Sequence, residues 1–177
     1  WESGPYAVGY QTWTHRFGNP AGDDRTIPMN LWYPTEDSGG EDVSYYGFPD
    51  ENAFGDAEPI PPIHEDGYPV LVYSHGSYGY GGTSAFLARH FASHGWLVIA
   101  PDHLGNIITD YTDDVDFAVR YNRPGDDSAA IDALSNIPNW VHPIQSDSVI
   151  LSGHSYGGYD NWALAGARIN MEQVESQ

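Results

Sequence analysis

One pentapeptide near the end of the chain constrains the fold more than any other stretch. Gly153-His154-Ser155-Tyr156-Gly157 follows the apolar run 149–151 and precedes an alanine-rich segment with helical character. A strand, a turn with glycines on both sides of a serine, and a helix together form the pattern of a nucleophile elbow. The glycines are needed because so tight a turn leaves no room for Cβ atoms. The pattern predicts that Ser155 exposes its hydroxyl at the apex of the turn; the alternative is a glycine-rich turn without chemistry.

The rest of the chain supplies strands of the kinds that such an elbow requires. Aromatic, β-branched and alternating apolar residues predict two antiparallel strands, at 6–15 and 25–34. Near-continuous apolar runs predict strands buried on both faces of a parallel sheet, at 68–74, 96–100 and 147–152.

Helical segments alternate with these strands. The first is expected at 84–94, capped by Thr83, with Phe86, Leu87 and Phe91 on its buried face. The second is expected to start at 124–127 and to continue through 128–137, with Ile131 and Leu134 facing inward, after a mixed acidic segment at 106–122. The third is expected at 156–170. The order predicts one α/β domain over residues 1–177, a mostly parallel sheet with helices on both faces.

Residues 35–68 break the pattern. Prolines, glycines and carboxylates interrupt any periodicity, so we expect a long acidic loop, and whether it forms a lid is left open. Its carboxylates do not match the spacing of a Ca²⁺ loop. His90 and His94, four residues apart on the first helix, lack an evident third ligand. The sequence therefore predicts no metal site.

The charge balance excludes several kinds of partner. The chain has 25 acidic residues, only six basic residues, all of them arginine, and a net charge of −19. Such a chain repels phosphate backbones and anionic membrane surfaces, so nucleic-acid binding is excluded. Adaptation to salty or divalent-rich surroundings and compositional drift both remain open explanations.

Two further features bear on the setting of the protein. No run of 18 apolar residues predicts a transmembrane helix, and the absence of cysteine removes disulfides and thiolate metal sites. The chain begins at Trp1 without a signal peptide, as expected either for a secreted or periplasmic protein after processing or for a trimmed chain.

A serine nucleophile also needs backbone N–H groups that bind the developing oxyanion. The residue after the nucleophile, Tyr156, supplies one, and Ser77, in the loop after the 68–74 strand, is expected to supply the other. His75, Tyr78 and His154 flank this position and are candidate substrate-binding residues, although the two histidines could instead support loops through hydrogen bonds. The glycine-rich segment after His75 lacks the lysine of a phosphate-binding loop.

The general base is harder to find. In this strand order an acid and then a histidine should follow the serine, but no histidine occurs after Ser155. The acids that do follow it, Asp160, Glu172 and Glu175, come after no further strand. His103, at the end of a strand, is the one upstream candidate. We therefore expect the chain to be the N-terminal part of a larger hydrolase whose remaining strands, acid and base lie on a second polypeptide.

Taken together, the motifs resemble one branch of a known superfamily. They are Leu31-Trp32-Tyr33-Pro34, Ser74-His75-Gly76, Ala92-Ser93-His94-Gly95, Ala100-Pro101-Asp102-His103, Arg123-Pro124 and Gly153-His154-Ser155-Tyr156-Gly157-Gly158-Tyr159. In this order they resemble the platelet-activating-factor acetylhydrolase-like branch of the α/β-hydrolases, near the dienelactone hydrolases and bacterial polyester hydrolases. The resemblance implies a serine esterase or lipase without a cofactor, with Ser155 as nucleophile and Ser77 and Tyr156 in the oxyanion hole.

Three interpretations of function follow. The first is hydrolysis of a small-molecule, lipid or polymeric carboxylic ester through an acyl-enzyme, with a cutinase-like polyester hydrolase as its variant. The second is a hydrolase-like binding module that forms no covalent adduct. The third is a truncated chain whose unpaired sheet edge, after the strand at 149–151, invites association.

Overall fold

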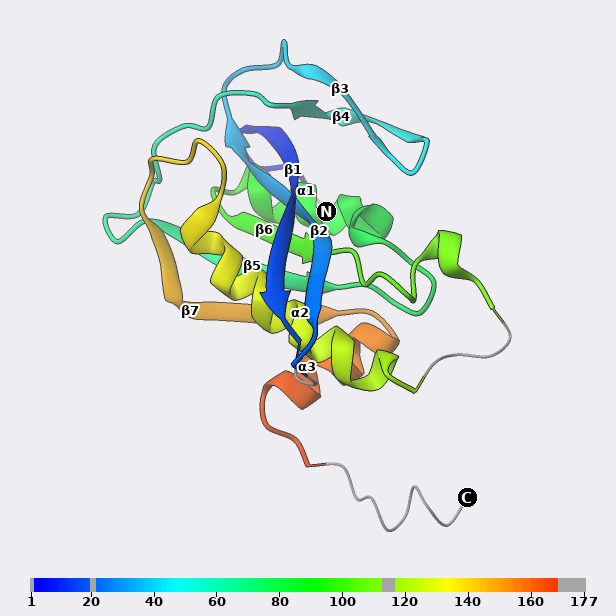
Figure 1. Ribbon diagram of the computed structural model, residues 1–177. Coiled ribbons are helices and arrows are strands. Elements are labelled where there is room, and N and C mark those ends of the chain that lie inside the picture. Colours follow the sequence, from blue (N-terminus) through cyan, green and yellow to red (C-terminus); the bar gives the residue numbers. More distant parts are fainter. Residues whose placement is uncertain (1, 20–21, 113–116, 169–177) are drawn as a thin grey trace.

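The strands form one mixed sheet. A computed structural model describes residues 2–19, 22–112 and 117–168 (Figure 1), and within them seven strands pair in the order β3-β4-β1-β2-β6-β5-β7. Their bounds are Ala7–Gly18 for β1, Asp24–Thr35 for β2, Glu41–Tyr45 for β3, Phe48–Gly55 for β4, Tyr68–Ser74 for β5, Leu97–Pro101 for β6 and Ile144–Gly153 for β7. The antiparallel pair β1/β2 and the parallel strands β6, β5 and β7 confirm the predicted α/β fold class.

Helices connect the parallel strands. The α-helices are α1 at Ala85–Ser93, α2 at Val119–Ala133 and α3 at Tyr156–Leu164. Short 3₁₀ turns are η1 at Gly81–Ser84, η2 at Ile108–Asp110 and η3 at Leu134–Asn136. The last residues of the predicted third helix, 169 and 170, lie outside the described residues, as do Glu172 and Glu175.

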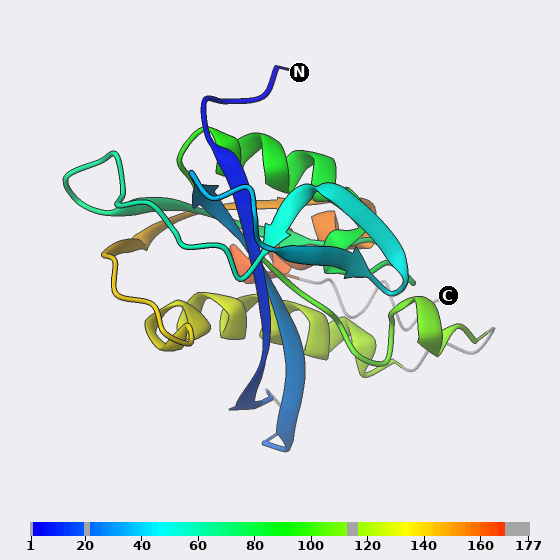
Figure 2. The same ribbon diagram turned by 90° about the horizontal axis from the view of Figure 1, so that it is seen from above.

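Alternation along the central strands builds a core on each face of the sheet. Val70 and Val72 of β5 join the cluster that contains Ala129, Ala130 and Ala133 of α2. Leu71 and Tyr73 join the opposite cluster, which contains Ala85, Ala88 and Ala92 of α1. Figure 2 shows α1 and α2 on opposite sides of the sheet. Both faces of β5 are therefore buried, which explains its unbroken apolar sequence.

The prediction of a long loop at 35–68 is wrong for the middle of that range. Strands β3 and β4 form an antiparallel hairpin there, and β4 pairs in parallel with β1. Tyr46 and Gly47 connect the two strands with φ angles of 50° and 87°, as in a two-residue hairpin turn. Val43 and Tyr45 point into the core while their neighbours face solvent. This alternation covers too few residues for the sequence pattern to predict a strand.

Two helix predictions also need correction. In α1 the buried residues are small, namely Ala85, Ala88, Ala92 and Ser93, which lets the helix lie close to the sheet. Leu87 and Phe91 pack partly buried against the core, as predicted, but Phe86 is 62% exposed. Thr83 lies within η1 rather than capping α1, and its Oγ1 accepts a hydrogen bond from the Tyr80 N–H. Helix α2 begins at Val119, five residues before Pro124, which it carries in its interior.

The two edge strands of the sheet, β3 and β7, differ in length and in charge. The hairpin strand β3 is five residues long and acidic at its start, whereas β7 is ten residues long and pairs with β5 alone among the described residues. The exposed backbone of such a strand can pair with another chain. On β7, Ile150 is 48% exposed, which leaves an apolar side chain beside that unpaired edge.

Candidate active site

Ser155 occupies a strained turn between β7 and α3. Its φ is 54° and its ψ is −115°, a conformation that is costly for a residue with a Cβ atom. The side chain is exposed at the carboxyl end of the parallel strands. Strain of this kind persists only where surrounding contacts enforce it, so the contacts of the turn are informative.

The flanking glycines provide those contacts. A Cβ atom on Gly153 would lie 2.5 Å from the backbone of Gly157, and one on Gly157 would lie 2.0 Å from the carbonyl oxygen of Ser74. Strands β5 and β7 pair up to this point, and the His154 N–H donates to the Ser74 carbonyl at 3.2 Å. The turn therefore has room for glycine alone at both positions, as the sequence motif predicts.

The loop after β5 lies against this turn. A Cβ atom on Gly76 would lie 3.4 Å from the Cβ of Ser155 and 3.1 Å from Nδ1 of His154. Ser77, the next residue, is exposed, and its hydroxyl donates to Oδ1 of Asn106 at 3.2 Å. Among the described residues we find no acceptor for the backbone N–H of Ser77 or of Tyr156. Two free donors thus come from segments that converge beside Ser155.

The burial and contacts of His75 favour its alternative role, the support of a loop, over contact with substrate. Its side chain is fully buried; Nδ1 lies 2.7 Å from the Gly76 carbonyl oxygen, and Nε2 accepts from the His103 N–H at 3.2 Å. Burial, His103 and Arg123 lower the pKa of His75 to about 2, so the ring is neutral. It supports the loop, which was the alternative role.

His154 and Tyr78 remain candidates for substrate contact. His154 is exposed next to Ser155. Tyr78 is partly buried with a φ of 57°, and its hydroxyl donates to the carbonyl oxygen of Thr112 at 2.6 Å. Its ring lies 4.9 Å from that of Tyr111, which is 71% exposed. An aromatic pair thus follows the Gly76–Ser77 loop, although no contact places it against Ser155.

His103 is not positioned as a base for Ser155. The ring is fully buried, with Nδ1 3.0 Å from Oδ2 of Asp126 and Nε2 2.9 Å from the hydroxyl of Ser74. Burial, then Arg123 and Arg25, hold its pKa well below the usual range. Both ring nitrogens are therefore engaged inside the protein, and the prediction that His103 could act on the serine is wrong.

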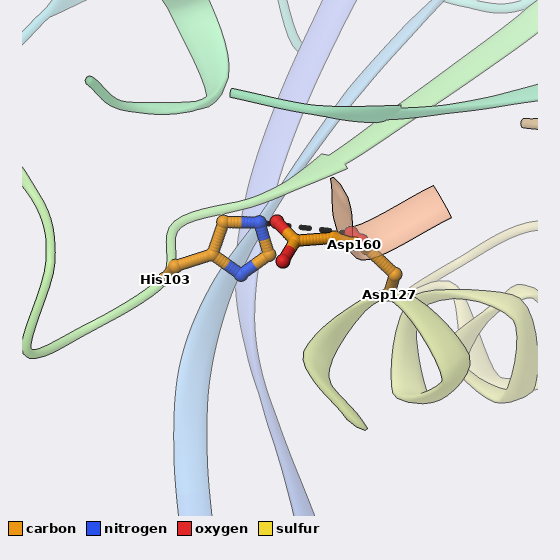
Figure 3. A group of neighbouring side chains, drawn as sticks. All are labelled: His103, Asp127 and Asp160. Carbon is orange, nitrogen blue, oxygen red and sulfur yellow. Dashed lines mark ion pairs between the residues drawn. The ribbon is translucent and has the colours of Figure 1, made fainter. Parts of the chain in front are cut away.

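A buried polar cluster lies behind the elbow. His103 follows β6, Asp127 belongs to α2 and Asp160 belongs to α3, and Figure 3 shows their side chains pointing toward one another. Nε2 of His103 is 3.6 Å from Oδ1 of Asp127. Burial, followed by the charge of Asp160, raises the pKa of Asp127 well above its usual range. Burial also raises the pKa of Asp160.

Arg123 connects this cluster to the loop beside Ser155. The side chain is 1% exposed; Nε donates to Oδ2 of Asp160 at 2.8 Å, and Nη1 donates to Oδ1 of Asn106 at 2.7 Å. Nη2 donates to the carbonyl oxygen of His75. Asn106 in turn accepts from the Ser77 hydroxyl and, through its backbone carbonyl, from the Tyr78 N–H at 3.1 Å. One guanidinium therefore holds the position of the loop that carries the free N–H of Ser77.

Sequence reasoning misses these supporting residues. It identifies Arg123 only as part of an Arg-Pro motif, and it gives Asn106 and Asp160 no role. Their function depends on contacts between β5, α2 and α3, which no local pattern encodes. One signal in the sequence could have indicated them: an arginine beside a proline and two consecutive aspartates lie in a segment expected to be helical. A helix packed on a sheet buries one of its faces, so some of these charged residues would be buried and would need partners.

The fold and the elbow define the class of protein: this is an α/β-hydrolase. A family model described as chlorophyllase matches residues 59–175. The chain belongs to the chlorophyllase family, rather than to the platelet-activating-factor acetylhydrolase-like branch that its motifs resembled. No curated protein matches the chain in sequence.

Solved structures share the fold. A ferulic acid esterase from Streptomyces cinnamoneus aligns with a TM-score of 0.70 and 22% identity, over 91% of this chain and 56% of the esterase. A protein from Klebsiella pneumoniae subsp. pneumoniae MGH 78578, assigned as a dienelactone hydrolase, aligns with a TM-score of 0.48 and 14% identity, over 89% of this chain and 56% of the other. The chain thus spans little more than half the length of either. In the part that the structure describes, no helix is long and apolar enough to cross a membrane.

Proposed function

We propose that this chain carries the nucleophile and the oxyanion hole of a serine-dependent carboxylic ester hydrolase. The observation that carries the proposal is the backbone of Ser155, an exposed serine held at a φ of 54° between two glycines that admit no side chain. A strained, exposed serine at the carboxyl end of a parallel strand is the arrangement of an esterase nucleophile. The likeness in fold to a ferulic acid esterase supports an ester as the substrate.

In the proposed reaction the Ser155 hydroxyl oxygen attacks the ester carbonyl and its proton passes to a general base. The negative charge that develops on the carbonyl oxygen is stabilised by the N–H groups of Ser77 and Tyr156. Collapse of this intermediate expels the alcohol, which takes up the proton, and leaves an acyl group on Ser155. Water then attacks the acyl-enzyme by the same route and releases the carboxylic acid.

The base and its orienting acid are proposed to come from a second segment. Among the described residues, no histidine donates to or accepts from the Ser155 hydroxyl, and His75 and His103 are engaged elsewhere. The unpaired edge of β7 and the span of 56% of the ferulic acid esterase support a further segment docking beside the elbow. A polyester substrate is retained as an alternative, because the Tyr78–Tyr111 pair would suit aromatic ester units as well.

Chemical rescue tests this assignment with the 177-residue chain itself. If the nucleophile and oxyanion hole are formed but the base is absent, added imidazole can accept the serine proton. Turnover of an aryl acetate should rise with imidazole well beyond the rate that imidazole gives in buffer. A serine site that lacks its base still accelerates hydrolysis about 10³-fold over the reaction in water. The protein-dependent rate without imidazole should be of this order.

Two matched variants make the result specific. Ser155→Ala should remove all protein-dependent turnover, whereas Ser152→Ala, three residues earlier in β7, should keep it. Equal rescue in Ser155→Ala would contradict the assignment. Binding of an ester without turnover, with or without imidazole, would favour the hydrolase-like binding module instead.

A further inference from the structure

We propose that His103, Asp127 and Asp160 bind a divalent transition metal ion, Zn²⁺ in the first instance, as a structural centre beneath the elbow. Each residue offers one ligand atom, and these atoms lie within 4.8 Å of one another (Figure 3). One imidazole nitrogen and two carboxylates form a donor set that zinc accepts. The three ligands come from the end of β6, from α2 and from α3, so the ion would join elements that are far apart in sequence.

The first argument is the tautomer of His103. Both oxygens of Asp126 already accept hydrogen bonds from Arg25, at 2.6 and 2.9 Å, so Asp126 is an acceptor and Nδ1 of His103 must be the donor to it. The Nδ1–H group therefore points to a carboxylate, and Nε2 presents its lone pair to Asp127. A carboxylate that orients a histidine in this way is the usual outer partner of a zinc-binding imidazole.

The second argument is a shortage of donors. Within the described residues, neither carboxylate oxygen of Asp127 accepts a hydrogen bond of good geometry, although the side chain is completely buried and the Ser74 hydroxyl lies close enough to interact with it, and Oδ1 of Asp160 also lacks a partner. The Ser74 hydroxyl lies 2.9 Å from both Nε2 of His103 and Oδ2 of Asp160, and its single proton cannot serve both acceptors. Buried acceptors that face one another without a donor are costly unless a cation lies between them.

A proton on His103 does not remove this shortage. The 3.6 Å between Nε2 of His103 and Oδ1 of Asp127 is too long for a hydrogen bond. Two ligands bound to one tetrahedral zinc at about 2.1 Å lie about 3.4 Å apart, close to the observed separation. A proton on Nε2 could serve the Ser74 hydroxyl, but it would supply no donor to Asp127. A proton on Asp127 itself, which burial favours by raising the pKa of that carboxyl, occupies only one of its two oxygens.

The local charge is compatible with a bound cation. Three buried carboxylates, those of Asp126, Asp127 and Asp160, face two guanidinium groups, those of Arg25 and Arg123. With a neutral His103 and all three carboxylates ionised, the set carries one negative charge in excess. A proton on Asp127 removes that charge in the metal-free chain, because burial and Asp160 raise the pKa of that carboxyl well above its usual range. A divalent ion would replace that proton and occupy the unpartnered oxygens, with the Ser74 hydroxyl or a water as its fourth ligand.

Metal content and stability test the proposal independently of ester hydrolysis. The chain is stripped with EDTA, equilibrated with ZnSO₄, desalted and analysed for bound zinc, and its thermal midpoint is measured with and without the metal. The wild-type chain should retain about one zinc ion per molecule and melt several degrees higher with zinc. Cobalt in place of zinc should give the visible absorption of a tetrahedral Co²⁺ site.

Asp127→Asn and Asp132→Asn form the matched pair, since Asp132 is exposed on the same helix. Asp132→Asn should bind zinc as the wild type does. Asp127→Asn should bind none, and without metal it should be about as stable as the wild type, because an asparagine, like the protonated carboxyl that burial favours there, carries no charge and loses no ion pair with an arginine. A wild-type chain that folds but retains no zinc and gives no cobalt spectrum would overturn the proposal, as would zinc binding that survives in Asp127→Asn.

Discussion

The two ends of the sheet differ in how completely their buried polar groups are hydrogen-bonded. At the hairpin end, Nε1 of Trp32 donates to the hydroxyl of Tyr45, which donates to Asp50, and Arg89 completes the chain by pairing with that carboxylate. At the elbow end, several buried atoms lack partners within the described residues: both oxygens of Asp127, Oδ1 of Asp160, Oδ1 of Asn161 and Nδ2 of Asn106; nearer the hairpin, on β1, Nε2 of Gln11 also lacks one. Backbone strain at Ser155 and the unpaired outer edge of β7, among the described residues, belong to the same end.

This difference separates scaffold from site. Satisfied polar groups and well-packed aromatics, such as the rings of Tyr10 and Tyr45 at 5.2 Å, hold the hairpin end in one arrangement. Strain and unmet hydrogen bonds cost stability and persist where another requirement selects them. We therefore propose that the elbow end is completed by substrate and base above Ser155, and by a cation among the carboxylates below it.

The largest expected effect comes from the glycine beneath the elbow. Gly157→Ala places a Cβ atom 2.0 Å from the Ser74 carbonyl oxygen, so β5 and α3 must move apart. We expect a loss of about 4 kcal/mol or more in the free energy of unfolding, enough to unfold many domains. Gly158→Ala meets no atom within 4 Å and should instead stabilise α3 by about 0.5–1 kcal/mol. Urea denaturation of both variants checks this, and equal stabilities would contradict the proposed geometry.

The next effect compares the arginines at the two ends. Arg123→Met leaves the buried Asp160 carboxylate without its ion pair and releases the His75 carbonyl, so we expect a cost of about 3–5 kcal/mol. Arg89→Met should cost about 1–2 kcal/mol, because Arg89 is partly exposed and Asp50 keeps the hydrogen bond from Tyr45. If calorimetry found the Arg89 variant as unstable as the Arg123 variant, the contrast between the two ends would fail.

How much of this can be predicted depends on whether the signal is local. The elbow is encoded in five consecutive residues, and β5 in its continuous apolar run, so both can be found from the sequence. The hairpin escapes prediction because only Val43 and Tyr45 carry the buried side of β3, and two residues do not make a periodic pattern. The other signal for the hairpin is the turn at Tyr46-Gly47. It does not stand out, because glycines and carboxylates occur throughout 35–68.

The buried cluster cannot be predicted by the same means. Asp127 and Asp160 are acidic residues on helices, and such residues are usually solvated. Their burial results from the packing of α2 against α3 and from the return of β6 to the centre of the sheet. The prediction that Phe86 lies on the buried face of α1, where Ala85 and Ala88 lie instead, is wrong for a related reason. The distance between helix and sheet depends on tertiary packing, which no local pattern encodes.

The central claim is that Ser155 is a nucleophile, and covalent trapping tests it most directly. The chain is incubated with a fluorophosphonate probe in the presence of imidazole, and its intact mass is measured under denaturing conditions, followed by peptide mapping. The account predicts a single adduct at Ser155, and none in Ser155→Ala. A wild-type chain that remains unmodified, or an adduct that persists in Ser155→Ala, would contradict it.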